Sequence, residues 1–230
     1  MERTQLDEST RLKLHSGDYV KVMESLPIHR LGNLLPLMGL SGDQVLVDLA
    51  CGPGVLARLV HDKVARYEGV DFSPEFVASA TGMVERLGIG NARFHCSDVV
   101  DYCLAHPQSA DVVTAFDFSE HIYDDEFLRI FSAARDLLKP GGTLHVYTPN
   151  GSFFYEWMKN HRLAPQFPQH VAVRTEGQNR RLLEQCGFAA GAIECLNPPH
   201  FNVFRHLHAL SRLPGLGGAF RAKLYFKCSK

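Results

Sequence analysis

From Gln44 onward, short apolar runs alternate with stretches of helical spacing, and this alternation limits the folds that the chain can adopt. Strands are predicted at 45–50, 65–70, 92–96, 110–116 and 143–147, with helices at 54–63, 73–88 and 124–138. Strands that alternate with helices at this spacing form a parallel sheet that helices cover on both faces. We therefore predict an α/β fold with a doubly wound sheet.

The two ends of the chain depart from this alternation. Residues 9–38 have helical spacing that Pro27 and Pro36 interrupt, so residues 1–40 are predicted to form an N-terminal helical cap of two short helices. Residues 41–230 are predicted to form one globular unit. In its last third, an aromatic stretch at 151–170 precedes a helix that begins at Thr175, and two further strands follow at 189–196 and 222–228.

Composition excludes several classes of partner. The 230 residues are 45% hydrophobic and carry a formal net charge of −1, so the chain can bury one core, and it has no Lys/Arg block that would bind nucleic acid. No apolar run approaches the roughly 18 residues needed for membrane insertion. The N-terminus, MERTQLDEST, does not read as a secretory signal, and the six cysteines form no C-x-x-C pair. These features predict a cytoplasmic protein, and they leave its oligomeric state open.

A glycine loop follows the first predicted strand, in the stretch VLVDLACGPG. Gly52, Gly54 and Ala57 match the pattern G-x-G-x-x-G/A, and Asp71 lies 19 residues after Gly52 at the end of the next strand. A carboxylate at that place accepts hydrogen bonds from ribose hydroxyls in any adenosine cofactor. The loop therefore fits NAD and other adenosine cofactors alike.

Three further features separate these cofactors. Asp48 lies within the first strand, Ser97-Asp98 follows the third, and FDFSEH follows the fourth. Together with DLACGPG and LLKPGG, they resemble the class I S-adenosylmethionine (SAM)-dependent methyltransferase family over about residues 40–150. The resemblance implies a Rossmann-like seven-stranded sheet, mostly parallel with an antiparallel last strand, and makes 41–230 a SAM-binding domain. Ala50 departs from the family, which often has glycine there.

The resemblance also implies roles for individual residues. The glycine backbone would approach the methionine part of SAM, Asp48 would orient its amino group, and Asp71 would hold both ribose hydroxyls. Phe72 would pack on the adenine, and Asp98 would accept a hydrogen bond from the adenine amine. The complete predicted cofactor-binding set is Asp48, Ala50, Cys51, Gly52, Gly54, Asp71, Phe72, Ser97, Asp98, Val99 and Phe116.

The loop after the fourth strand would face the methyl group, because ligands of a doubly wound sheet lie beyond the carboxyl ends of its strands. Asp117, Glu120 and His121 have i, i+3, i+4 spacing and would share a face if this loop were helical. They resemble the D/E-x-x-E-H element of the ubiquinone-biosynthesis O-methyltransferases, which implies a divalent metal held by these three residues. The alternative is that they cap the next helix and line the pocket.

Methyl transfer to a hydroxyl needs a group that takes the proton, and the catalytic candidates are His121, His170 and Glu120. His170 lies in FPQHVAVRT, which is similar to a substrate-side stretch of related methyltransferases. The aromatic run Phe153, Phe154, Tyr155 and Trp157, the cap and residues 198–216 would close the pocket. We therefore predict a methyltransferase acting on a small molecule, with oxygen as the acceptor ahead of nitrogen or carbon.

Two other functions stay open at this point. Tyr155-x-x-x-Lys159 matches the catalytic pair of short-chain dehydrogenases, although Asp48 stands where their glycine pattern requires glycine. A non-catalytic SAM-binding module would bind the cofactor without an open cavity beside Glu120 and His121. The pair His206 and His208 is interpreted as surface or packing.

Overall fold

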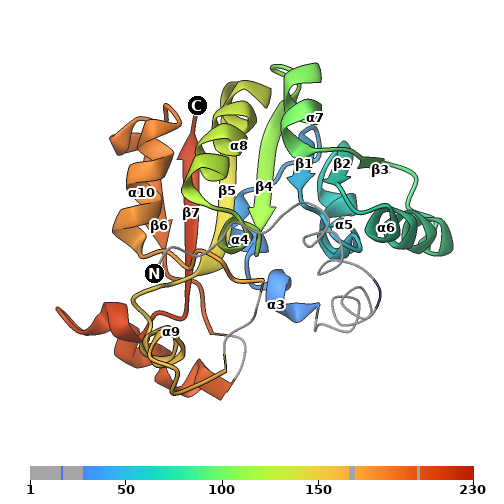
Figure 1. The fold of residues 1–230 in the computed structure, drawn as a ribbon. Coiled ribbons are helices and arrows are strands. Elements are labelled where there is room, and N and C mark those ends of the chain that lie inside the picture. Colours follow the sequence, from blue (N-terminus) through green and yellow to red (C-terminus); the bar gives the residue numbers. More distant parts are fainter. Residues whose placement is uncertain (1–16, 18–27, 166–168, 201–202) are drawn as a thin grey trace.

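A single seven-stranded sheet organises the protein, as the computed structural model shows for residues 17, 28–165, 169–200 and 203–230 (Figure 1). The strand order is β3-β2-β1-β4-β5-β7-β6. The strands are β1 (Val45–Leu49), β2 (Arg66–Asp71), β3 (Ala92–Cys96), β4 (Ala110–Phe116), β5 (Leu138–Pro149), β6 (Ile193–Leu196) and β7 (Lys223–Ser229). Strands β1 to β5 pair in parallel, whereas β7 runs antiparallel to both β5 and β6. This confirms the predicted α/β class and the antiparallel last strand.

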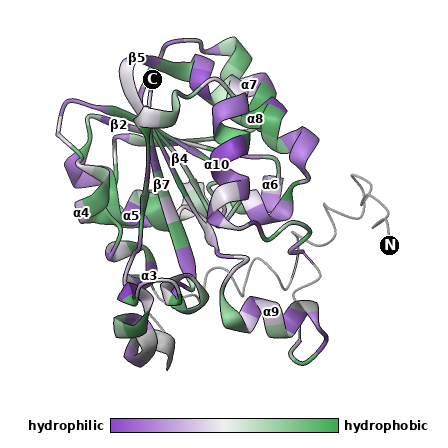
Figure 2. Ribbon diagram, turned by 90° about the vertical axis from the view of Figure 1, so that its left-hand side faces the viewer, coloured by the Kyte–Doolittle hydropathy of each residue, from purple (hydrophilic) through white to green (hydrophobic). Residues whose placement is uncertain are grey.

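Helices cover both faces of the sheet and enclose two apolar clusters (Figure 2). One face carries α4 (Leu35–Met38), α5 (Val55–Val60) and α6 (Pro74–Leu87), and the other carries α7 (Val99–Ala105), α8 (Asp124–Leu137) and α10 (Glu176–Gln185). The remaining helical elements are α3 (His29–Gly32), α9 (Phe154–Asn160) and the 3₁₀ segments η1 (His61–Lys63), η2 (Ser119–His121), η3 (Ala190–Ala192), η4 (Val203–Arg212) and η5 (Gly217–Phe220). Strands β1 and β4 are almost continuously apolar because both of their faces are buried.

The predicted helix boundaries hold where capping residues define them. Ser73 accepts a hydrogen bond from the backbone N–H of Phe76 at the start of α6, and Gly88 ends that helix in the left-handed region. Thr175 and Gln178 form the predicted capping box of α10.

Two expectations about proline-containing segments were wrong. Pro36 does not interrupt a helix but lies in the first turn of α4, where its missing N–H costs nothing. Lys139-Pro140-Gly141-Gly142 is not a stop before a strand that starts at 143, because β5 begins at Leu138 and absorbs the turn as an irregularity in its pairing with β4. The first predicted cap helix and Phe167 lie outside the described residues, whereas α3 and α4 occupy the place of the second cap helix.

Gly54 sets how closely α5 approaches its neighbours. Its φ is +77°, and a Cβ there would lie 2.9 Å from Met83 Cε, 3.0 Å from Phe94 Cζ and 3.1 Å from Ala80 Cβ. The glycine that ends the loop therefore allows α5 to pack against α6 and β3.

Replacing Gly54 by alanine should destabilise the fold more than replacing Gly88, which has a φ of +67° and open space where a Cβ would stand, with no described atom within 4 Å. Gly88→Ala adds only the left-handed backbone strain, about 1–2 kcal/mol. Gly54→Ala adds overpacking of about 1–3 kcal/mol on top of that strain. Urea unfolding of both variants measures the difference, and equal losses would contradict the packing role.

Candidate active site

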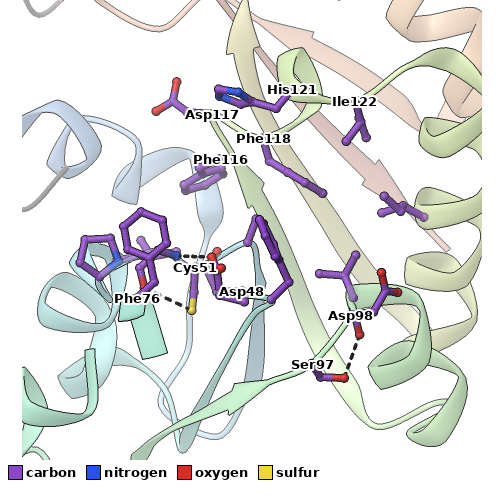
Figure 3. A pocket seen from close by; sticks show the side chains of 18 of the residues that line it. Asp48, Cys51, Phe76, Ser97, Asp98, Phe116, Asp117, Phe118, His121 and Ile122 are labelled. Atoms are coloured by element: carbon purple, nitrogen blue, oxygen red, sulfur yellow. Dashed lines mark hydrogen bonds between the residues drawn. The ribbon is translucent and has the colours of Figure 1, made fainter. Parts of the chain in front are cut away.

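A cavity of about 830 Å³ lies at the carboxyl ends of β1, β2, β3 and β4 (Figure 3). This is the edge where a doubly wound sheet binds ligands. Asp48, Ser97 and Asp98 lie toward one end, and Asp117 and His121 lie toward the other. Ten of the eleven residues predicted to bind the cofactor line it: Asp48, Ala50, Cys51, Gly52, Asp71, Phe72, Ser97, Asp98, Val99 and Phe116.

Asp48 is buried in the middle of the sheet. Tyr67 on β2 donates its hydroxyl to Oδ2 at 2.6 Å, and Thr114 on β4 donates to Oδ1 at 2.6 Å. Burial raises the pKa of Asp48 to about 6, and the two hydroxyl donors only partly oppose this rise. Each carboxylate oxygen has two acceptor positions, so both can accept a further hydrogen bond from a ligand in the cavity.

Asp71 ties the glycine loop to the end of β2. Its Oδ2 accepts from the backbone N–H of Gly52 at 2.9 Å, and its Oδ1 accepts from the N–H of Ser73 at 2.9 Å. The carboxylate therefore fixes the loop, and the same side chain lines the cavity.

Asp98 both caps a helix and lines the cavity. Its Oδ1 caps α7 by accepting from the N–H groups of Val100 at 2.7 Å and Asp101 at 3.3 Å. The same side chain lines the cavity, and Ser97 donates its hydroxyl to the Asp98 carbonyl at 3.0 Å. The helix cap thus orients the carboxylate toward the cavity.

Four more of the predicted cofactor-binding residues differ in what the structure shows for them. Ala50 has a φ of +55°, so the turn that the family often builds with glycine is formed here by a strained alanine. Phe72 is 40% exposed and lines the cavity, as a platform for a flat ring would. Burial raises the pKa of the Cys51 thiol well above its usual range, which keeps the thiol protonated and inert. Gly54 does not line the cavity, and its position is explained by helix packing instead.

At the other end of the cavity, the expected shared face of Asp117, Glu120 and His121 is not formed. The helical turn covers only η2, and Asp117 precedes it with a φ of +50°. The Asp117 carboxylate pairs with the guanidinium of Arg30 and, at 2.5 Å, with the ammonium of Lys223. Burial opposes ionisation of Asp117, but these two cations lower its pKa to about 2.

Glu120 is not one of the residues that line the cavity. Its side chain is buried, Thr148 donates to Oε2 at 3.2 Å, and Oε1 lies 4.0 Å from Lys223 Nζ. Burial raises the pKa of Glu120 to about 7 although Lys223 lowers it. Glu120 therefore has no direct path to an acceptor in the cavity.

His121 is the catalytic candidate that lines the cavity, whereas His170 does not line it. His121 Nδ1 lies 3.0 Å from the carbonyl oxygen of Gln169, so in the neutral ring Nδ1 carries the proton and Nε2 is the acceptor. The His170 ring packs edge-on against His121 with their centroids 5.2 Å apart. Burial lowers the pKa of His170 to about 4, so its imidazole is neutral at physiological pH.

The predicted metal ligands do not come together as a set. Glu120, His121 and His170 instead place ligand atoms within 4.8 Å of one another, while Asp117 is held by two cations. The donor set of two imidazoles and a carboxylate would suit a transition metal better than magnesium. The Lys223 ammonium lies 4.0 Å from the Glu120 carboxylate, and its positive charge would repel a metal cation there. The site therefore fits a divalent cation poorly.

Arg174 holds the η2 turn in place and was not singled out from the sequence. Its guanidinium donates to the carbonyls of Ser119 at 2.6 Å and Ile122 at 2.8 Å. It also pairs with Asp124 and lies over the Phe127 ring. The only local signal was its place at the end of FPQHVAVRT, since its partners lie about fifty residues earlier in the chain.

The dehydrogenase pair is not built into the cavity. Lys159 Nζ bonds Glu156 Oε1 at 2.6 Å in a buried pair and lies 5.1 Å from the Tyr155 ring centre. Neither Tyr155 nor Lys159 lines the cavity.

His206 is exposed, and His208 packs against the ring of His200. The aromatic run divides likewise, since Phe153 is buried whereas Trp157 is 54% exposed.

Residues 46–142 match the family described as a methyltransferase domain. Over this stretch the chain is similar to methyltransferase domains. The matched stretch extends from β1 into β5 and includes the cavity residues between Asp48 and His121, whereas Arg30 lies before it. No helix among the described residues has the length and apolar character that a membrane span requires.

Several similar proteins are ubiquinone biosynthesis O-methyltransferases. The chain is 36% identical over 112 residues to the ubiquinone biosynthesis O-methyltransferase of Sodalis glossinidius, covering 49% of this chain and 43% of that protein. The enzyme of the same name from Cupriavidus pinatubonensis is 32% identical over 153 residues, covering 64% and 58%. These matches confirm the similarity to the ubiquinone-biosynthesis branch. The chain spans about half the length of the curated relatives it matches.

A solved structure confirms the Rossmann-like fold. A SAM-dependent methyltransferase from Archaeoglobus fulgidus aligns with a TM-score of 0.64 at 17% identity, covering 95% of this chain and 96% of that one. At this identity the likeness concerns the fold alone.

The buried carboxylate of Asp48 should make the protein less stable as the pH rises. Its folded pKa of about 6 lies above the ordinary aspartate value of 3.8, so the native state binds more protons between these values and loses stability as pH increases through them. In Asp48→Asn this loss should disappear. The unfolding free energy of the variant relative to wild type should therefore rise by about 2 kcal/mol between pH 4 and pH 7.

Chemical unfolding at a series of pH values measures this trend. Asp136→Asn, at a largely exposed carboxylate on α8, is the matched control and should show no such rise. A flat difference for Asp48→Asn would contradict the burial argument.

Proposed function

We propose that this protein is a SAM-dependent methyltransferase that transfers a methyl group to a hydroxyl oxygen of a small molecule. One observation carries the proposal: a single cavity has the carboxylates of Asp48, Asp71 and Asp98 in one part of its wall and His121 in another. The family match and the names of the relatives support the same chemistry.

The cofactor end fits SAM because the side chains that line it offer acceptors rather than a phosphate site. Asp48 would accept from the amino group of the methionine part, Asp71 from the ribose hydroxyls, and Asp98 from the adenine amine. Gly52 donates its N–H to Asp71, so this amide is not available to a pyrophosphate. SAM supplies an electrophilic methyl group on a sulfonium. This arrangement favours SAM over NAD.

His121 is the group that would take the acceptor's proton. The Gln169 carbonyl holds the ring in the tautomer with Nε2 as acceptor, which is the form that a general base requires. The acceptor oxygen forms a bond to the methyl carbon while the carbon–sulfur bond breaks with its electrons on sulfur. The hydroxyl proton passes to His121 Nε2. Phe116, Phe118 and Ile122 line the cavity and exclude water around the reacting oxygen.

We infer that the transfer needs no divalent metal, because Arg30 and Lys223 already supply positive charge at Asp117. The cavity extends to His121, so there is open space beside this histidine, and this argues against a module that only binds SAM. A cavity of about 830 Å³ falls within the range of small-molecule sites. A small-molecule partner and a cytoplasmic location stay predictions from the sequence.

Calorimetry should show binding of S-adenosylhomocysteine and none of NAD. Asp98→Asn should weaken S-adenosylhomocysteine binding about tenfold. An asparagine side chain has only one acceptor oxygen, so it cannot both cap α7 and accept from the adenine amine. Asparagine caps a helix as well as aspartate does, so the unfolding free energy should stay within about 0.5 kcal/mol of wild type. Asp101→Asn, an exposed neighbour on α7, is the control. Binding of NAD alone would overturn the proposal.

His121→Gln should lower the single-turnover rate of methyl transfer by about 10²–10⁴-fold while leaving S-adenosylhomocysteine binding intact, because the base acts only on the acceptor. His206→Gln, at an exposed histidine, is the control. Chelator should not change the turnover of the wild-type enzyme. A rate that survives His121→Gln would remove the base from this position, and chelator-sensitive turnover would restore the metal.

A further inference from the structure

Arg174 is a buried arginine that lies outside the cavity wall, with a side chain that is 5% exposed. Every nitrogen of its guanidinium has an acceptor within the protein. Nε donates to Asp124 Oδ1 at 2.8 Å, Nη1 donates to the Ser119 carbonyl at 2.6 Å, and Nη2 donates to the Ile122 carbonyl at 2.8 Å. Because its donors are used in this way, Arg174 acts through the residues that it holds rather than on a ligand.

The two carbonyls that Arg174 bonds lie on either side of His121. Ser119 is the first residue of the η2 turn, and Ile122 directly follows its last residue. Both hydrogen bonds are buried, so a carbonyl that lost its donor would be costly and the turn would move to satisfy it. A planar guanidinium offers its donors in a fixed fork, which a single ammonium group does not. The fork therefore fixes the backbone that carries the His121 ring.

The stretch of chain just before this arginine bonds the same turn through its backbone. The Gln169 carbonyl lies 3.0 Å from His121 Nδ1. The N–H groups of Val171 and Ala172 donate to the Glu120 carbonyl at 2.9 Å and 3.1 Å. One short segment thus supplies both the acceptor for the imidazole ring and the donors for the turn from which the ring extends.

Arg174 is itself attached to the sheet and to the next helix. Its carbonyl accepts from the N–H of Gly151, directly after β5, at 2.9 Å, and Thr175 begins α10 as its N-cap. A Cβ at Gly151 would lie 2.8 Å from the Val173 carbonyl oxygen, so glycine allows the two stretches of chain to approach this closely. The guanidinium therefore extends from a backbone that is held at a fixed place.

We propose that Arg174 is a positioning residue for His121, whose guanidinium holds the η2 turn against the Gln169 carbonyl so that the ring keeps its proton on Nδ1. This inference rests on the proposed function, in which Nε2 of the same ring takes the acceptor's proton. The hydrogen bond at one ring nitrogen decides which tautomer is present. Without the guanidinium, the turn and the Gln169 carbonyl move apart, and His121 exchanges between its two tautomers. Only the fraction with a bare Nε2 then accepts a proton.

Nitrogen-15 NMR of the full chain saturated with S-adenosylhomocysteine tests this inference without an acceptor, because protonated and unprotonated imidazole nitrogens resonate at well-separated frequencies. The His121 signals are those that disappear in His121→Gln. The spectra are recorded at a pH of about 8, where a histidine of ordinary pKa is neutral. In wild type the Nδ1–H tautomer should exceed the other by about tenfold, as one buried hydrogen bond allows. In Arg174→Gln the ratio should fall to about twofold or less, and Arg174→Lys should lie between them.

The affinity for S-adenosylhomocysteine separates positioning from a general loosening of the fold. Arg174→Gln should bind this compound within about twofold of wild type, because Arg174 does not line the cavity. Arg181→Gln changes an exposed arginine of α10, and Gly88→Ala strains the backbone at the end of α6. Both control variants should keep the tautomer ratio of wild type.

Each other outcome decides against the inference. An unchanged ratio in Arg174→Gln, a ratio lost together with the affinity for S-adenosylhomocysteine, or an equal loss in Gly88→Ala would overturn it. A wild-type ring that carries its proton mainly on Nε2 would overturn it as well. If Arg174→Gln does not fold, Arg174→Lys decides, and an unchanged ratio there would contradict the need for the fork. Failure of wild type to bind S-adenosylhomocysteine would instead refute the proposed function, and the inference with it.

Discussion

The geometry of the cavity depends on the carboxylate of Asp71. It joins the N–H of Gly52 in the glycine loop to the N–H of Ser73 before α6, so it sets the distance between the ends of β1 and β2. A backbone amide that bonds a carboxylate is strongly held, because charge-assisted hydrogen bonds are about twice as strong as neutral ones. The loop therefore presents a fixed edge to a ligand rather than closing around it.

Buried acidic groups at this edge reduce stability in exchange for a prepared site. Asp48 is held by two hydroxyl donors rather than by a cation, and Glu120 is buried beside one ammonium. Ala50 and Asp117 add backbone strain on either side of the cavity. Such groups suit a ligand site, because an acceptor that is already fixed in place needs little reorganisation energy to bind a charged partner.

The sequence was sufficient to predict that Asp48, Asp71 and Asp98 come together at one cavity. Asp48, Asp71 and Asp98 each follow or lie in a strand, and the carboxyl ends of parallel strands meet at one edge, so local spacing carries the geometry. The other end was not predictable in this way. Arg30 and Lys223 meet at Asp117 from positions 87 and 106 residues away, and His170 reaches His121 across 49 residues of chain. No periodicity records such pairs. The spacing of Asp117, Glu120 and His121 indicated one helical face, but Asp117 has a left-handed backbone and lies outside the η2 turn.

The segment 169–174 has a consequence for how this protein can change. Val171 and Ala172 donate to the Glu120 carbonyl, and Arg174 bonds the η2 turn, so an excursion after β5 shapes the wall around His121. The opposite wall is made within a continuous stretch of sequence, from β1 to the start of α7. Substitutions in this segment can therefore change the surroundings of His121 without touching the residues between β1 and the start of α7.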